Sequence, residues 1–492
     1  MVEVTGKSHR MLFMNTLAFT IAFATWMTNG VLVTYLVDNR IYDWDPVAMG
    51  WLIGIPVLTG AIFRLPAGIL TDKYGGKWVV GGTLLFVSIP MYLMSKADTY
   101  EEFLLCSLGF GLAGTIFSSG IAFTSVWYPK KWQGTALGIF GAGNAGAALT
   151  TLVAPTLIKK FTDNGANIDG WRDLPVAYAI MVFTMGVLFL LLTENKKASG
   201  QEGKTLAGQL RTLKDARVWR YGLQYFLVFG MFVAFAQWLV PYFVNVYYLP
   251  LVMAGFFVSF FSFPSGVIRA LGGYLSDKFG AIPVMYWVAG TSLLFAIFLS
   301  IPKMEVYSPG KGVVSFRAGT VTEVTDTYIQ VDDKKYNYHG KDMANVEVDK
   351  AYHLNETNIL PTKEEWQEPV VKVGDKVNKK ELLAKGVTKV YFMANVYIFA
   401  VLAIIIGAIW GIGKAAVYKM IPDHFPNDVG VVGGMVGVIG GLGGFVGPIV
   451  FGYLLKYSGL WISSWVFILV LSSVCLILLS KESEVVPEHQ HH

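Results

Sequence analysis

A series of apolar runs, each long enough to cross a bilayer as a helix of about 20 residues, constrains this chain more than any other feature. Hydrophobic residues are 54% of the chain and charged residues 15%, whereas a soluble domain carries about 25% charged residues. Because lipid offers the backbone no hydrogen-bond partners, these runs must be helices. We expect an all-α polytopic membrane protein with twelve spans, at roughly 11–37, 46–71, 77–96, 102–127, 133–158, 174–193, 219–247, 251–276, 281–302, 390–420, 430–455 and 460–480.

The charged residues of the loops predict an orientation. Seven basic residues lie in the segment 195–220, whereas the loop 38–45 holds three aspartates against one arginine. We expect the protein in the inner (plasma) membrane of a cell. By the positive-inside rule, both of its termini are expected in the cytoplasm. The net charge of +5 reflects these loops and does not indicate nucleic-acid binding. Cys106 and Cys475 fall inside predicted helices, as buried apolar residues and not as disulfide or metal ligands.

Two arginines lie within the apolar runs, in segments that repeat each other. The chain reads RLPAGILTDKYGG from Arg64 and RALGGYLSDKFG from Arg269, each with an aspartate eight residues later. A charge inside the bilayer costs several kcal/mol unless it is paired, and neither predicted helix holds a carboxylate near its arginine. A single arginine could instead extend to the headgroups. Two arginines at equivalent depth favour an anionic substrate as the missing partner, held by two planar forks of donors.

The repeat also divides the chain into domains. The arginines are 205 residues apart, whereas the matching glycines Gly134 and Gly430 are 296 apart, so the second half must hold an insertion of about ninety residues. Residues 303–388 hold 27 of the 73 charged residues, with strand-like runs at 321–331 and 368–377. The expected organisation is a six-helix bundle, a cytoplasmic linker, helices seven to nine, an extracytoplasmic β-rich insertion, helices ten to twelve and a tail, at 1–194, 195–218, 219–302, 303–388, 389–482 and 483–492.

The stretch VVKVGDKVNKKELLAKG in the insertion resembles a strand of a lipoyl or biotinyl domain. It lacks the lysine in a methionine-flanked turn that such domains modify, so we expect no cofactor. The insertion is expected to have a structural role or to dock a partner.

Two predicted helices are rich in glycine, which allows close helix approach. The fifth reads GTALGIFGAGNAGAALT and holds Asn144, whose amide can donate to an anion; the eleventh reads GVVGGMVGVIGGLGGFVGP. We expect both to bend or slide as gates, through Gly141, Gly143, Gly146, Gly437, Gly440 and Gly441.

GILTDKYGGK and GYLSDKFG resemble the loop signature that follows the second and, in degenerate form, the eighth helix of the major facilitator superfamily. The resemblance implies a gating role for Gly68, Asp72, Lys73, Asp277 and Lys278.

The paired arginines and the glycine-rich segments with Asn144 resemble the nitrate/nitrite porter family of that superfamily, over all twelve helices but not the insertion. The resemblance implies that Arg64 and Arg269 contact nitrate. It also implies that Asn144, Tyr225 (in YFLVFG) and Phe117 (twelve residues before Pro129) line the pocket. The family contains proton-coupled nitrate symporters and nitrate/nitrite exchangers.

Lys414 bears on that choice. It stands in GIGKAAVYKMIP, where part of the family has a neutral stretch, and the lysine form is similar to the symporter branch. Buried lysines can release a proton, because desolvation disfavours the charged form. The cores of the predicted spans hold no Asp, Glu or His, the usual intramembrane proton carriers. We therefore expect proton-coupled nitrate uptake, with exchange as the alternative.

Three further alternatives remain at this stage. Another small anion would also need arginines, although phosphate would recruit more cations and a carboxylate would need a larger pocket. A non-transporting anion sensor would use residues 303–388 as its signalling element. An enzyme is not expected, since the sequence shows no metal-ligand cluster, nucleophile–base pair or phosphate loop.

Overall fold

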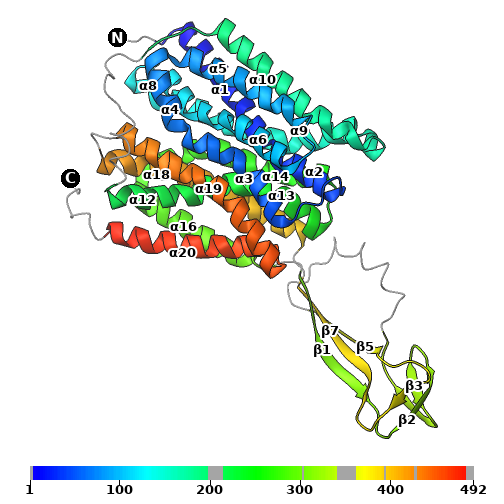
Figure 1. The fold of residues 1–492 in the computed structure, drawn as a ribbon. Coiled ribbons are helices and arrows are strands. Elements are labelled where there is room, and N and C mark those ends of the chain that lie inside the picture. Colours follow the sequence, from blue (N-terminus) through cyan, green and yellow to red (C-terminus); the bar gives the residue numbers. More distant parts are fainter. Residues whose placement is uncertain are drawn as a thin grey trace. The chain divides into compact units, whose positions relative to one another are not determined.

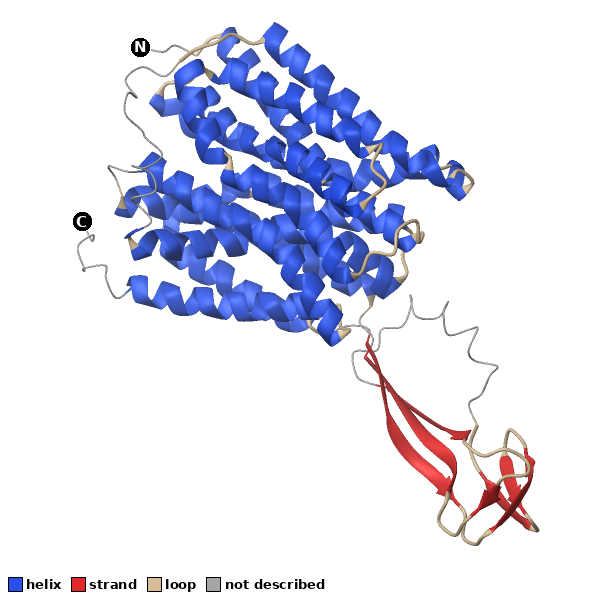
Figure 2. Cartoon of the chain, viewed as in Figure 1, coloured by secondary structure: helices blue, strands red, loops and turns tan. Residues whose placement is uncertain are grey.

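The computed structural model describes residues 4–197, 214–301, 304–340, 362–392, 395–425 and 429–483. It divides into two compact units, residues 1–300 with 400–492, and residues 301–399. The first unit is helical (Figures 1 and 2). Its described residues contain eleven helices long and apolar enough to cross a membrane, or twelve when the bent pair α14–α15 is counted as one span. The expected fold class is therefore confirmed.

Six spans are unbroken or nearly so. They are α5 (Gly76–Met94), α10 (Asp173–Leu192), α16 (Ala281–Leu299), α18 (Val396–His424), α19 (Val429–Ser458) and α20 (Ser463–Ser483).

The other six spans are interrupted part-way along. These are α1–α2 (Gly6–Trp26, Thr28–Asp38), α3–α4 (Pro46–Ile62, Arg64–Tyr74), α6–η1–α7 (Tyr100–Gly111, Leu112–Thr115, Ile116–Ser125), α8–η2–α9 (Lys130–Gly141, Ala142–Ala145, Gly146–Phe161), α12–η6–α13 (Ala216–Tyr225, Phe226–Gly230, Met231–Tyr247) and α14–α15 (Leu251–Val267, Arg269–Phe279).

The interruptions position the two arginines. Arg64 is the first residue of α4 and Arg269 the first of α15, each directly after a residue with ψ near zero that ends the preceding segment. The bend between α14 and α15 is 44°. The repeat in the sequence thus becomes a repeat of local structure, with each arginine at a break in its span.

We call the side of the bundle where α1 begins and α20 ends the terminal side (Figure 1), and the other the opposite side. On the opposite side the two halves pack closely through glycines. A Cβ atom at Gly54 of α3 would lie 2.6 Å from the Phe445 carbonyl oxygen of α19, and one at Gly50 would meet the Pro448 carbonyl. An ion pair between Asp45 and Lys456, 2.8 Å long, also joins the halves there.

The second unit is a small β structure with two antiparallel sheets. One has the order β1-β7-β5 and the other β4-β3-β2-β6. Its core includes Val321, Ile329, Val331 and Tyr336. The run 321–331 forms two paired strands, since Asp326 and Thr327 turn the chain between them. The strands are β1 (Met304–Val314), β2 (Gly319–Val324), β3 (Tyr328–Val331), β4 (Lys334–Asn337), β5 (Thr362–Pro369), β6 (Lys376–Val377) and β7 (Leu382–Phe392).

The prediction that the tenth span starts at residue 390 is wrong. The chain remains in strand β7 as far as Phe392, which pairs with Met304 of β1, and α18 begins at Val396. The β-branched and aromatic run before Phe392 is apolar enough to read as helix, but it favours a strand when a partner strand is present.

Candidate functional site

Arg64 is buried between the two halves of the helical unit, with 4% of its surface exposed. Its Nη1 donates to the carbonyl of Gly437 on α19 at 3.0 Å, and its Nε donates to the carbonyl of Gly114 at 3.4 Å. Its Nη2 is buried and has no hydrogen-bond partner. The sequence predicted an unpaired Arg64, but in the structure two of its nitrogen atoms donate hydrogen bonds. Only Nη2 remains an unused donor.

Arg269 approaches the same place from the other half and is only partly buried. Its guanidinium carbon lies 6.0 Å from the centre of the Phe117 ring and 5.6 Å from that of Tyr418. The Arg64 guanidinium lies 5.1 Å from the same Phe117 ring. Phe117 thus stands against both cations, and the ring faces provide a favourable electrostatic contact for each.

Two stacked rings complete this wall. Tyr225 stacks on Phe229 with their centroids 5.0 Å apart and their planes 7° apart, and Phe229 lies 5.3 Å from the Arg64 guanidinium. The Tyr225 hydroxyl is fully buried and lies within electrostatic range of both arginines, with Tyr418 and Arg269 within hydrogen-bonding reach. The π-helical segment η6, which begins one residue after Tyr225, contains Phe229.

Asn144 lies in η2, the 3-10 turn that interrupts the fifth span. It is fully buried, and neither its amide nitrogen nor its amide oxygen has a partner. It packs beside Gly266 of α14, where an added Cβ would lie 3.7 Å from the Asn144 Cβ. An added Cβ at Gly141, three residues before Asn144, would lie 3.9 Å from Arg269 Nη1, so the interrupted fifth span lies beside the second arginine.

Lys414 of α18 is a third cation at the site. It is fully buried, and its Nζ donates to Ser265 Oγ at 2.8 Å and lies 3.2 Å from the centre of the Phe232 ring. It is close enough to Arg269 for the two charges to repel. A hydroxyl and a ring face stabilise an ammonium group less than a carboxylate would.

Several glycines of the two glycine-rich spans contact these side chains. An added Cβ would lie 3.9 Å from Arg269 Nη1 at Gly141, 3.2 Å from Arg64 Nη1 at Gly441 and 2.9 Å from the Tyr418 hydroxyl at Gly437, and would overlap the Tyr225 ring at Gly440. Gly143 and Gly146 instead pack against α1, at Phe19 and Thr20.

The loop-signature residues lie away from the arginines. Asp72 and Asp277 follow Arg64 and Arg269 by eight residues, which is about 12 Å along a helix. Asp277 pairs with Lys419 of α18 at 2.9 Å. A Cβ added at Gly68 would meet nothing within 4 Å, while Lys73 and Lys278 lie over the rings of the next residues in the chain, Tyr74 and Phe279.

The sequence did not single out Phe229 and Tyr418. Each follows a chosen residue by four, Phe229 after Tyr225 and Tyr418 after Lys414, and residues four apart share a helix face. That spacing was a usable signal.

Comparison with known proteins places the chain in a family. The model of the major facilitator superfamily matches residues 14–322 and 382–491. A probable nitrate/nitrite antiporter of Thermus thermophilus is 35% identical over 455 residues, covering 92% of this chain and 86% of the relative. A nitrite extrusion protein of Bacillus subtilis is 27% identical, covering 64% and 76% of the two chains.

Solved structures show the same fold. A bacterial homologue of the human lysosomal transporter Spinster, inward-facing and occupied, has a TM-score of 0.66 at 13% identity and is covered to 98% in both chains. The nucleoside transporter NupG has a TM-score of 0.60 at 12% identity, over 96% and 99% of the two chains. The chain therefore belongs to the major facilitator superfamily and, within it, to the nitrate/nitrite porter family.

Proposed function

We propose that this protein carries nitrate, and also nitrite, across the membrane with the anion bound between Arg64 and Arg269. One observation carries the proposal: Arg64 Nη2 and the Asn144 amide are buried in the helical unit without hydrogen-bond partners. An unsatisfied buried polar group costs about 1–3 kcal/mol, and more when charged. An anion between the arginines would accept from such groups.

The surroundings favour a flat anion of low charge. Guanidinium forks bind planar oxyanions through parallel hydrogen bonds. The rings of Phe117 and Phe229 offer faces rather than further donors, and they suit a planar, weakly hydrated ion such as nitrate. A tetrahedral phosphate ion would need further hydrogen-bond donors, which these ring faces do not provide.

Transport follows from rocking of the two halves, about 11–193 and 219–480, around this site. Opposite-side closure is supported by the Gly50, Gly54 and Asp45 contacts with α19. On the terminal side, an added Cβ at Gly68, Gly134, Gly138 or Gly273 would meet no neighbouring group within 4 Å. The positive-inside rule favours a cytoplasmic terminal side, and with that orientation this conformation would be inward-facing.

For coupling, we favour proton-linked uptake through Lys414. Three adjacent cations with no anion are unfavourable, and release of the Lys414 proton lowers that charge by one. Nitrate binding would favour the protonated lysine, and nitrate release would favour proton loss. The empty carrier could then return with two positive charges instead of three, and each nitrate would enter with a proton.

Nitrate/nitrite exchange is the second candidate. The Thermus relative is named a probable antiporter, and an arginine pair that cannot close without an anion would enforce exchange. In that mechanism Lys414 only supports the arginine site.

Proteoliposomes distinguish these mechanisms. Nitrate uptake would be measured into empty and nitrite-loaded vesicles, with and without an inward proton gradient, for the wild type, Arg269→Ala and Lys414→Gln. Proton-driven uptake into empty vesicles that Lys414→Gln abolishes supports symport. Uptake only against internal nitrite supports exchange. Flux that survives Arg269→Ala, or no nitrate flux in any condition, would refute the arginine site.

A further inference from the structure

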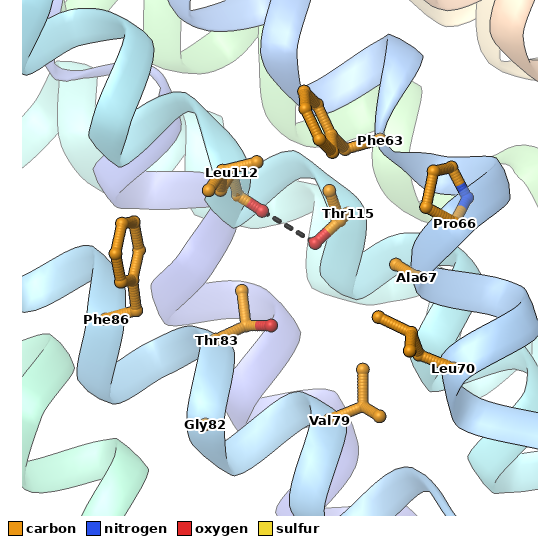
Figure 3. Close-up of a pocket in the computed structure, with 10 residues that line it drawn as sticks. All are labelled: Phe63, Pro66, Ala67, Leu70, Val79, Gly82, Thr83, Phe86, Leu112 and Thr115. Atoms are coloured by element: carbon orange, nitrogen blue, oxygen red, sulfur yellow. Dashed lines mark hydrogen bonds between the residues drawn. The ribbon is translucent and has the colours of Figure 1, made fainter. Parts of the chain in front are cut away.

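A pocket of about 260 Å³ in the helical unit is lined by residues on both sides of the break that holds Arg64, with Phe63 before it and Pro66 after it (Figure 3). Phe63, between α3 and α4, and Leu70 of α4 form one wall, and Gly82 and Phe86 of α5 form another. Phe63, Leu70 and Phe86 are each 45–51% exposed. On a membrane-spanning helix such exposed apolar residues face lipid.

The pocket offers an occupant almost no polar partner. Its floor includes Leu112 and Thr115 of η1, and the Thr115 hydroxyl already donates to the Leu112 carbonyl at 2.7 Å (Figure 3). The ligand that fits is therefore a hydrocarbon chain. The pocket exists because two adjacent spans are irregular at the same depth and because Gly82 has no side chain to fill it: an added Cβ there would meet nothing within 4 Å.

Two lysines stand at the terminal-side end of the pocket. Lys73 follows Leu70 by one turn, and Lys77 precedes Val79 of the lining by two residues. Each ammonium lies over an exposed ring, Lys73 over Tyr74 at 5.3 Å and Lys77 over Trp78 at 5.4 Å. Aromatic and basic residues together are typical of the headgroup level of a bilayer.

Two carboxylates lie in this region, and Asp72 directly precedes Lys73 in the chain. Glu194 lies within electrostatic range of Lys77, but it already pairs with Lys7 at 2.9 Å and Arg10 at 3.1 Å. Lys7, Arg10, Lys73 and Lys77 outnumber Asp72 and Glu194, so the local charge remains positive, which complements an anionic headgroup at this leaflet.

We propose that this pocket binds one acyl chain of an anionic phospholipid whose headgroup lies against Lys73 and Lys77. The site has a direct link to the arginine: η1 supplies both the pocket floor and the Gly114 carbonyl that accepts from Arg64 Nε. In addition, Ser118 Oγ donates to the Arg64 carbonyl at 2.8 Å. A lipid chain in the pocket thus supports the two elements that hold Arg64, in the conformation seen here.

The test is lipid retention by the purified full chain, measured by native mass spectrometry with phosphatidylglycerol or phosphatidylcholine. Gly82→Leu extends a side chain into the pocket from a position where an added Cβ meets nothing within 4 Å. Gly290→Leu is the matched control, because Gly290 on α16 also has nothing within 4 Å of an added Cβ and lies outside the pocket. Displacing two buried methylene groups should weaken binding about fifteenfold, since each changes affinity about fourfold.

The expected result is preferential retention of phosphatidylglycerol by the wild type and Gly290→Leu, its loss in Gly82→Leu, and loss of the headgroup preference in Lys77→Gln. Equal retention by Gly82→Leu and the wild type would overturn the acyl-chain site. Equal retention of the two lipids by the wild type would overturn the anionic assignment. Thr83→Leu, a second pocket-filling variant, serves if Gly82→Leu does not fold.

Discussion

The two ends of the interface between the halves are built from the same residue type but are used differently. On the opposite side, Gly50, Gly54 and Gly255 lie against backbone carbonyls of the other half. On the terminal side, Gly68 and Gly138 have open space where a Cβ would be. Glycine in a packed interface permits close helix approach, but in open space it serves no packing purpose. The difference indicates that the terminal-side glycines pack in the other conformation of the cycle.

The largest effect on transport is expected from Gly54→Val on the packed opposite side. Its Cβ would lie 2.6 Å from the Phe445 carbonyl oxygen, so the opposite side could not close as it does here. Overpacking of this kind costs about 1–3 kcal/mol, which shifts a two-state equilibrium about fivefold to 150-fold. Nitrate transport should fall by a similar factor.

Pulsed EPR distances between spin labels at Tyr74→Cys and Phe279→Cys, at the ends of α4 and α15, would report the state of the terminal side. In a background without Cys106 and Cys475, Gly54→Val should shorten this distance, because the terminal side closes when the opposite side opens. An unchanged distance with intact transport would contradict the assignment of the two sides.

Gly138→Val on the open side should act in the reverse direction and more weakly. It clashes with nothing in the present structure, and valine is at least as good a helix former as glycine, so folding should be unaffected. It should prevent full closure of the terminal side and slow transport up to about tenfold. Gly290→Val is the control on a surface that meets no other helix. If Gly138→Val transports at the wild-type rate, the terminal-side glycines have no packing role.

The sequence allowed prediction of much of this arrangement but not of its asymmetry. The arginine repeat and the two glycine-rich spans follow from spacing alone, and the structure places Arg64 and Arg269 at equivalent breaks. That Arg64 donates to Gly437 could not be read from the sequence, because the contact joins residues 373 apart across the halves and depends on which conformation is present. One sequence must be compatible with both conformations of a transporter, so it does not indicate which contacts form in either one.

The aromatic wall shows a second limit. Phe229 follows Tyr225 by the four residues of a helix face, but the π-helical turn η6 shifts the face that the later residues of α13 present. Ordinary helical periodicity cannot predict such a turn. The start of α18 was misjudged for a related reason, since the run before Phe392 is strand only because β1 pairs with it.

Gln237 offers a third test of the difference between the packed opposite side and the open terminal side. It is fully buried in α13 beside Gly30 of α2, and neither amide atom has a partner. A buried unsatisfied amide destabilises the conformation that contains it, by about 1–3 kcal/mol. Gln237→Leu should therefore stabilise the conformation seen here, raise the melting temperature and slow transport about fivefold. Gln237→Glu is the polar counterpart and should not raise the melting temperature. A lower melting temperature for Gln237→Leu would show that the amide is satisfied.

The smallest expected effect is that of the Asp45–Lys456 ion pair, which closes the opposite side at its edge. The bond from Lys456, followed by that from the Ala48 amide, holds the pKa of Asp45 below its usual range. The contribution of the pair to closure is therefore complete above the ordinary carboxyl range and is lost as pH falls through the lowered pKa. Both side chains are nearly half exposed, so solvent screens the pair and its contribution to closure is small. Asp45→Asn should slightly shorten the distance between the labels at residues 74 and 279 at neutral pH, and it should not lengthen that distance at any pH. Transport should change less than about fivefold. High salt should reproduce the effect in the wild type and not in the variant. A hundredfold loss in Asp45→Asn would mean that this edge contact, and not the glycine packing, controls closure.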